Sequence, residues 1–292
     1  MHSAEVIADS VSPAGVRLTT MVAVMPRIVL AEFNTHRVFS RNSASSRAIP
    51  VEKMIQAVQS HPYVPSSWGK NQRGMQAGED IQDPAMIRWC EEEWLRARDS
   101  AVEAAEQLMR NANVHKQLTN RLLEPFMWHT VIVTATEWSN FFHLRVNAAA
   151  HPDIRKTAAL MQLAMDRSTP LRRDYGQWHL PYVYEQERDS LADESLVKIS
   201  AARCARVSYL THDGKKDVSE DLALHDKLLS NGHMSPFEHA ARPYDSNTDR
   251  HLADFRRVPG FAELSECWFG NFRGWVQYRK LIPNEHDVLG AL

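Results

Sequence analysis

A basic, serine-rich segment from Thr35 to Arg47 carries the strongest chemical signal in the sequence. Its 13 residues include three arginines, one histidine, four serines and one asparagine. Arginine presents a planar set of donors that matches phosphate oxygens, and serine hydroxyls and backbone amides supply further donors. This composition is typical of a surface that binds a phosphorylated small molecule. A solvated basic loop has the same composition, so composition alone leaves both interpretations open.

Two further arginines lie in apolar stretches. Arg121 stands in Asn-Arg-Leu-Leu-Glu-Pro, and Arg145 stands in Phe-Phe-His-Leu-Arg-Val. An arginine in such surroundings must pair with an anion or extend to water. Each is therefore either a ligand-binding residue or the partner of a buried carboxylate.

A third signal is the segment from Asn231 to His239, which reads N-G-H-M-S-P-F-E-H. Asn-Gly is typical of a helix end, because both residues tolerate positive φ. The serine, glutamate and two histidines that follow can form an ordinary turn or hydrogen-bond a cofactor.

Other chemistries have no support in the sequence. It contains no GxxxxGK[ST], GxGxxG, GxSxG or HExxH motif. His233 and His239 flank Pro236 six residues apart, which is a poor arrangement for two ligands on one helix, and we expect no metal. The cysteines Cys90, Cys204 and Cys267 form no CxxC. We therefore expect neither a disulfide scaffold nor a cysteine nucleophile, and we place Cys267 in a packed helix.

Size and charge set broad limits. The chain has 292 residues, and a net charge of −2 argues against a general nucleic-acid or anionic-membrane binder. The longest apolar stretch, Met21–Phe33, is interrupted by a proline and two charged residues, so no membrane span is expected. Residues 1–10 lack the pattern of a signal peptide, and we expect a cytoplasmic protein.

Periodicity predicts the elements that must position these residues. We expect a strand over 16–24, a helix opened by Pro26, and a long surface loop over 61–82. The clearest helix begins at Asp83-Pro84, and its apolar stripe, which includes Met86, Trp89 and Leu108, is predicted to pack in the core. Further helical segments are expected at 115–123, 138–145, 152–166, 219–230 and 268–282, and a short helix or turn at 197–206.

A polar stretch with two prolines over 167–196 is the best candidate for a domain boundary. We therefore expect one half over 1–166 with the arginine-serine segment, a linker over 167–196, and a second half over 197–292 with the Ser-Pro-Phe-Glu-His turn.

Taken together, these segments resemble the flavin-dependent thymidylate synthases. That family carries the motif RHRxxSxNxxSxR, which is matched here from Thr35 to Arg47. Shorter family segments are matched at Ala205–Tyr209, Gly232–His239, Arg121–Pro125 and Asn140–Arg145. The order is rearranged, because the Val-Ser-aromatic and Pro-Phe-Glu-His segments follow the arginine-serine motif instead of preceding it. Gly274–Arg279, running on to Asn284 and Glu285, resembles a decayed second copy of the motif and its leading helix.

The resemblance implies a fold and an activity. The fold would be α+β, a mostly antiparallel sheet with packed helices and an additional helical portion. The activity would be FAD-dependent C5-methylation of a uridine monophosphate, UMP or dUMP. Methylenetetrahydrofolate would be the carbon donor, reduced flavin the hydride source and NADPH a co-substrate, and no protein cysteine would activate the ring. The family also implies a homotetramer with active sites between subunits.

The resemblance also assigns residues. Those implied to contact the flavin are His36, Arg37, Val38, Asn140, Ser208, His233, Ser235 and Glu238. Those implied to bind the nucleotide are Glu32, Ser43, Ser45, Arg47, Arg121 and Arg145. Arg47 and Arg121 would suit the phosphate. Arg145 and Ser45 would be catalytic, with Arg145 on the carbonyl edge of the pyrimidine, where it would stabilise negative charge.

Several positions depart from the family pattern around the pocket. Thr35 replaces the first motif arginine, Ser43 an acidic residue and Glu32 a glutamine, while Thr134 and Thr136 stand where asparagine and arginine commonly contact the cofactor. The substrate therefore stays open. The alternatives are a UMP methylase of nucleoside-antibiotic biosynthesis, a cytidine nucleotide as substrate, transfer of hydroxymethyl, and a non-catalytic flavin- or nucleotide-binding homologue.

Overall fold

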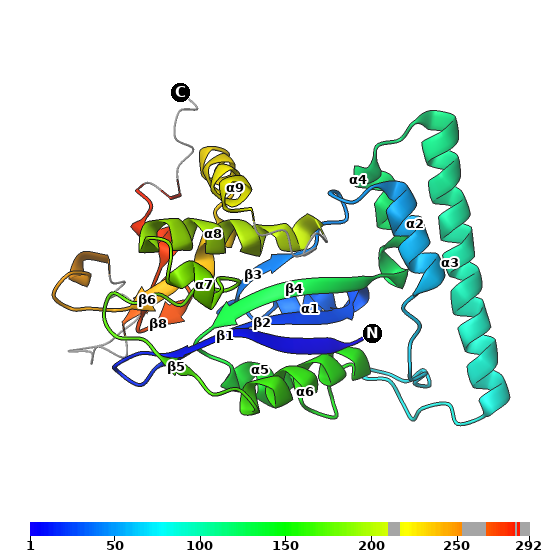
Figure 1. The fold of residues 1–292 in the computed structure, drawn as a ribbon. Helices are drawn as coiled ribbons and strands as arrows, with labels where there is room; N and C mark the ends of the chain where they lie inside the picture. Colours follow the sequence, from blue (N-terminus) through cyan, green and yellow to red (C-terminus); the bar gives the residue numbers. More distant parts are fainter. Residues whose placement is uncertain (210–216, 253–266, 284, 287–292) are drawn as a thin grey trace.

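A five-stranded sheet forms the centre of the computed structural model, which describes residues 1–209, 217–252, 267–283 and 285–286 (Figure 1). Neighbouring strands are antiparallel except for one short parallel pair, β1 with β5. This confirms the predicted α+β class with a mostly antiparallel sheet. In sheet order the strands are β3 (Ser40–Ser43), β4 (Trp128–Ala135), β2 (Arg17–Pro26), β1 (Ser3–Val11) and β5 (Leu171–Arg172).

Alternation along the central strands sends side chains to two different cores. Met21 and Met25 of β2 lie in one cluster, whereas Ile132 of β4 lies in another on the opposite face. The strand predicted over 16–24 is thus confirmed. Pro26 ends β2, and the 3-10 helix η1 (Arg27–Val29) and helix α1 (Leu30–Asn34) follow, as predicted.

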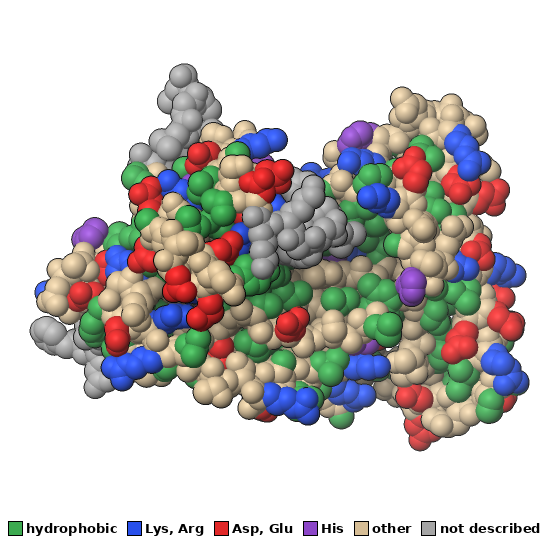
Figure 2. Space-filling model, in the orientation of Figure 1, with side chains coloured by type: hydrophobic (Ala, Val, Ile, Leu, Met, Phe, Trp, Pro, Cys, Tyr) green, Lys and Arg blue, Asp and Glu red, His purple; other side chains and the backbone are tan. Residues whose placement is uncertain are grey.

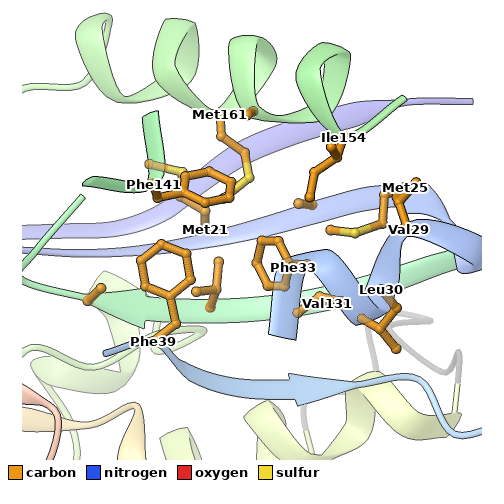
Figure 3. Packing of buried hydrophobic residues seen from close by; sticks show 14 of the residues in the cluster. Met21, Met25, Val29, Leu30, Phe33, Phe39, Val131, Phe141, Ile154 and Met161 are labelled. Carbon is orange, nitrogen blue, oxygen red and sulfur yellow. The ribbon is translucent and has the colours of Figure 1, made fainter. Parts of the chain in front are cut away.

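The larger core lies between the sheet and the helices α5 (Ser139–Arg145) and α6 (Pro152–Asp166), which agree closely with the prediction. Figure 3 shows Ile154 and Met161 pointing from α6 toward β2, with Phe141 beside Met21 and Phe33 reaching into the same core from α1. Burial of these apolar side chains is the main force that fixes the motif segment, because Phe33 and the following residues belong to this core.

The opposite face carries α8 (Asp193–Ala205), the 3-10 helix η3 (Arg206–Tyr209) and α9 (Val218–Ser230). Cys204 and Val207 pack on Ile132 of β4. A short helix, α7 (Glu185–Arg188), precedes α8, and its Glu187 forms a buried ion pair with Arg203. The helices expected near 197–206 and 219–230 are thus present, the first beginning four residues earlier.

A helical portion stands at one end of the sheet (Figure 1). It contains α2 (Val51–Ser60), which the sequence reading missed, α3 (Pro84–Ala112), α4 (Lys116–Thr119) and the 3-10 helix η2 (Asn120–Phe126). The helix expected over 115–123 is therefore one α-turn followed by 3-10 helix, with Pro125 inside the latter. The loop over 61–82 contains no helix and only an isolated bridge, as predicted.

The core role predicted for the stripe of α3 is correct for one part of the helix and wrong for the other. Asp83 caps the helix as expected, accepting a hydrogen bond from the amide of Ala85. Val102 and Ala105 are buried, and Trp94 and Met109 pack against the same cluster. Met86, Trp89 and Leu108 are instead between 40% and 56% exposed. The reason is geometric, since α3 lies at the rim of the molecule. Figure 2 shows hydrophobic side chains there among charged ones.

The helix predicted over 268–282 is also wrong. The segment forms β7 (Trp268–Phe269), β8 (Phe272–Arg273), β9 (Trp275–Gln277) and the 3-10 helix η8 (Tyr278–Leu281). Gly270 and Gly274 take φ of 64° and 67°, which breaks a helix and permits a tight turn. β9 then pairs with β6 (Ala241–Pro243), and Cys267 precedes β7, outside any helix. Within the described ranges, no helix is long and apolar enough to span a membrane.

Candidate nucleotide and flavin site

The arginine-serine motif runs from the end of α1 into β3, the edge strand of the sheet. Aromatic side chains of the core pack against this turn and fix its position. The His36 ring meets Phe141 edge-on at 4.9 Å, and Phe39 contacts Trp138 at 4.7 Å. The apolar residues interleaved with the motif therefore hold its polar residues in place.

Arg145 lies at the centre of a hydrogen-bonded cluster at the end of α1. Its Nε donates to His36 Nε2 at 2.9 Å. Its Nη2 donates to the Glu32 carbonyl at 3.2 Å and to Thr35 Oγ1 at 3.0 Å. Thr35, which replaces a motif arginine, thus contributes a hydroxyl that also donates to the Glu32 carbonyl. Three residues assigned from the resemblance, Glu32, His36 and Arg145, are brought together.

His36 is held neutral in this cluster. Burial, together with the nearby cations Arg145 and Arg41, lowers the pKa of its imidazole to about 4. Because Nε2 accepts from Arg145, the ring proton must be on Nδ1. A neutral acceptor orients the guanidinium without neutralising its charge.

The cationic character of the cluster is not cancelled. Arg145 has no carboxylate partner in the part of the chain that the structure describes, so it is not the partner of a buried carboxylate. Arg41 lies close enough to His36 and to Glu238 for electrostatic interaction, and Arg37 also acts on it. Burial lowers the pKa of the Arg41 guanidinium, and Glu238 opposes this shift. Arg41 is a site residue that sequence reasoning missed, although it lies inside the motif.

Glu32 adds an unsatisfied acceptor to the cluster. Its Oε2 is buried and has no hydrogen-bond partner among the residues described. Buried carboxylate oxygens are normally hydrogen-bonded. A ligand that donates an N–H group would satisfy this oxygen.

The Ser-Pro-Phe-Glu-His turn lies next to the motif strand. The 3-10 helix η4 (Ser235–Glu238) packs on β3, and its Phe237 side chain is fully buried. Glu238 forms an ion pair with Arg279 at 2.6 Å. His233 and Ser235 are exposed beside it. The structure thus joins two signals that lie about 190 residues apart in the sequence.

Three other residues assigned to the flavin differ in setting. Val38 packs partly against the main core, and Asn140 is exposed at the start of α5, the helix that carries Arg145. Arg37 is exposed. Ser208 is placed in η3, but its side chain lies outside the described part, as does Asn284 of the second motif copy.

A second polar group gathers around Glu124. Its Oε1 accepts from Ser46 Oγ at 2.9 Å and lies 3.5 Å from Arg121 Nη1, and Arg27 approaches the same carboxylate. Arg121 is thus paired with a carboxylate, yet its side chain is 53% exposed. It lines an open groove of about 480 Å³. The other residues that line this groove are Arg27, Ile28, Leu30, Ala31, Asn34, Glu124 and Pro125.

The two arginines lie on different sides of α1. The groove with Arg121 uses Leu30, Ala31 and Asn34, whereas Arg145 contacts residues 32, 35 and 36. Ser43 and Ser45 are half-buried and Arg47 is exposed in the segment that links the motif to α2. A single chain therefore does not bring all the nucleotide residues of the prediction to one point.

A buried chain of side-chain hydrogen bonds runs through the sheet behind the turn. It joins Ser10, His179, Thr20, Thr134 and His239, with distances between 2.7 and 2.9 Å. Thr134 is thus turned inward, and the backbone amide of Arg273 donates to Thr136 Oγ1. The two threonines therefore pair with the protein itself at the positions where the resemblance implies cofactor contacts.

The described ranges contain neither a reactive thiol at Cys204 nor a cluster of metal ligands. Burial raises the pKa of the Cys204 thiol, which keeps it protonated. No group of three or more His, Cys, Asp or Glu residues in these ranges is arranged to hold a metal ion.

The chain matches the protein-family model described as thymidylate synthase complementing protein. The match covers residues 14–171, just over half of the chain. The chain belongs to this family. It is thus a thymidylate synthase-like methyltransferase, of the flavin-dependent class that acts on nucleotides. The matched region contains the motif, Arg121 and Arg145, whereas the Ser-Pro-Phe-Glu-His turn lies outside it.

Two solved structures illustrate what the chain is similar to. The UMP/dUMP methylase PolB from Streptomyces cacaoi, bound with 5-Br UMP, is 16% identical with a TM-score of 0.45, over 59% of this chain and 90% of that chain. The flavin-dependent thymidylate synthase ThyX from Helicobacter pylori, complexed with FAD and dUMP, is 15% identical with a TM-score of 0.36, over 51% and 67%. No curated protein sequence matches the chain.

Proposed function

We propose that this protein is a FAD-dependent methylase that acts at C5 of a uridine monophosphate, UMP or dUMP. Methylenetetrahydrofolate supplies the carbon and NADPH the reducing equivalents. The observation that carries the proposal is Arg145, a cation at the motif whose partners among the described residues are all neutral. A preorganised positive charge of this kind stabilises negative charge that develops on a bound ligand.

The residues near the motif fit an anionic flavin dinucleotide. Arg37 and Arg41 offer guanidinium groups, and the neutral His36 and the exposed His233 and Ser235 offer further hydrogen-bonding atoms. This donor set suits pyrophosphate and ring heteroatoms. When bound, the flavin supplies the reducing electrons of the reaction, and the protein positions and polarises its ligands.

Arg145 and Ser45 are proposed to act on the substrate. Arg145 binds the carbonyl edge of the pyrimidine, while His36 and Thr35 keep its guanidinium in one orientation. Ser45 lies at the end of the motif, where its hydroxyl contributes to nucleotide binding beside Arg47. The buried thiol of Cys204 takes no part.

A cytidine nucleotide is a second candidate substrate, favoured by Glu32. Its unsatisfied Oε2 can accept a hydrogen bond from an exocyclic amine, while Arg145 donates to the neighbouring ring acceptor. The N3–H of uracil would satisfy the same oxygen. Either base can therefore donate to Glu32 Oε2 and accept from Arg145.

The active enzyme is proposed to be a homo-oligomer, a tetramer by the family resemblance, with sites between subunits. Arg121 and Arg145 lie on different sides of α1, so a second copy is needed to bring one set of each together. The exposed apolar residues Met86 and Trp89 on α3 provide a surface that a second copy can bury.

The test is an anaerobic incubation of the purified protein with NADPH, methylenetetrahydrofolate and UMP, dUMP or CMP, read by mass spectrometry. A gain of one methyl group on UMP or dUMP supports the proposal, and the faster substrate defines the sugar preference. Methylation of CMP alone would replace it with the second candidate. Bound flavin without any product would indicate a non-catalytic homologue.

A further inference from the structure

The C-terminal strand β9 and the 3-10 helix η8 contact both parts of the candidate site. Gln277, which is 1% exposed, donates from Nε2 to Ser40 Oγ at 3.0 Å and to the Glu238 carbonyl at 3.4 Å. One buried amide therefore joins the motif strand β3 to the turn η4. The family match ends at residue 171, so this C-terminal contact lies outside the part that defines the family.

Arg279 continues the same connection with charged groups. Its Nη1 donates to Glu238 Oε1 at 2.6 Å, and its Nε donates to Glu285 Oε2 at 2.5 Å. Lys280 also donates to Glu285. The side chains of Arg279, Glu238 and Glu285 are 27%, 16% and 12% exposed, so the pairs are sheltered from water. Charge-assisted hydrogen bonds of this kind fix side-chain orientation more firmly than neutral ones.

In this arrangement only one carboxylate oxygen of Glu238 is hydrogen-bonded by the described residues. Oε1 is held by Arg279, whereas Oε2 has no hydrogen-bond partner in the described part of the chain. The carboxylate also lies within electrostatic range of Arg41 on the motif strand. A glutamate without Arg279 would sample several rotamers, and a ligand would have to restrict them on binding.

We infer that Arg279 is a positioning residue for flavin binding, which acts by holding Glu238 so that Oε2 faces the bound cofactor. Arg279 itself makes no contact with the flavin, and Glu285 fixes Arg279 from the other side. This inference rests on the proposed function, because it concerns the same flavin site. It assigns the C-terminal segment a role in ligand binding that the motif alone does not supply.

The test is a double-mutant cycle on FAD affinity, measured by fluorescence titration of the apoprotein. Arg279→Met is expected to raise the Kd roughly tenfold, the scale of one lost charge-assisted contact. Glu238→Gln is expected to raise it at least as much. In the Glu238→Gln background, Arg279→Met is expected to add nothing, because Arg279 acts only through Glu238. An additive loss in the double variant overturns the inference, since it means that Arg279 contacts the flavin itself.

Matched variants separate positioning from general stability. Lys280→Met removes a cation that shares Glu285 with Arg279 but does not touch Glu238, so the Kd for FAD is expected to be unchanged. Arg279→Lys restores the charge and is expected to recover part of the affinity. Thermal unfolding of each variant shows whether the fold is kept. Glu285→Gln gives a second, milder test, with a rise of about two- to threefold expected.

The outcomes distinguish this inference from the proposed function. Wild-type protein that binds FAD, together with an Arg279→Met variant of unchanged Kd, overturns the inference and leaves the proposed function standing. Wild-type protein that binds no FAD overturns both.

Discussion

Arg145 Nε donates a hydrogen bond to His36 Nε2 at 2.9 Å, although 109 residues separate the two in the chain. The contact joins the end of α5 to the turn after α1. It gives the guanidinium a fixed orientation while His36 stays neutral. The cation that the family resemblance places on the substrate is therefore oriented before any ligand binds.

Replacing Arg145 tests this role directly. Arg145→Ala is expected to keep the fold and the bound flavin and to lower methylation by at least about 100-fold, the scale seen when one preorganised donor is removed. Turnover is measured by mass spectrometry of the nucleotide. Arg155→Ala is a matched control, because within the described ranges Arg155 donates to the Ala148 carbonyl alone. Near-normal turnover of the Arg145 variant would contradict the role.

Stability is expected to fall as the solution becomes acidic. Burial lowers the pKa of His129 to about 4 and of His179 and His239 to about 3, from 6.5. Between these values the unfolded chain binds more protons than the folded one, so the free energy of unfolding rises with pH. The stabilisation is complete above pH 6.5 and is lost as pH falls toward about 3 to 4. Urea unfolding at a series of pH values checks this, and a flat profile from pH 7 to 4 would disprove it.

The buried hydrogen-bond chain behind the turn predicts the effect of Thr134→Val. The change leaves His239 Nδ1 and Thr20 Oγ1 without their partner at Thr134. The free energy of unfolding is expected to fall by about 1 to 3 kcal/mol, the cost of leaving buried polar groups unsatisfied. Thr130→Val on the same strand is the control, since Thr130 is only half-buried. Equal stability of the two variants would argue against a structural role for the chain.

Gly270 lies in the turn between β7 and β8, and an added side chain there would collide with Gln277 of β9. A Cβ there would lie 2.1 Å from Gln277 Oε1, and the backbone has a φ of 64°. Gly176 also has a positive φ, 84°, but nothing lies within 4 Å of its Cβ position. Gly270→Ala is therefore expected to lower the unfolding temperature more than Gly176→Ala, which carries only the left-handed strain of about 1 kcal/mol. Equal shifts would mean that Gln277 yields without cost.

The exposed face of α3 predicts a change in assembly. Trp89→Glu places a charge on a side chain that is 56% exposed in the single chain. If a second copy covers this face, the charge must be desolvated, and the oligomer is expected to dissociate into smaller species. Light scattering coupled to gel filtration measures the mass, with Glu93→Gln on the same helix as control. A wild-type protein that is already monomeric would contradict the proposed assembly.

Local sequence patterns predicted much of the fold and the position of the site. Periodicity predicted the strand β2, and proline and aspartate marked the starts of α1, α3 and α6. The strand β3 inside the 35–47 segment was not predicted. The local patterns failed over part of α3, where the exposed residues Met86, Trp89 and Leu108 were predicted to pack in the core. Periodicity reports which side of a helix is apolar, but it does not say whether another element lies against that side.

The sequence by itself determined the fold class and the motif, and it pointed to Arg121 and Arg145 as candidate site residues but not to Arg41. The tertiary structure alone decided what each polar side chain meets. Arg145 proved to have neutral partners and Arg121 a carboxylate, although both stand in similar apolar stretches. The strands at the C-terminus likewise depend on the pairing of β9 with β6, since aromatic residues spaced by glycine suit either a helix or a hairpin. Such contacts join residues far apart in the chain, and local patterns carry no record of which distant groups will meet.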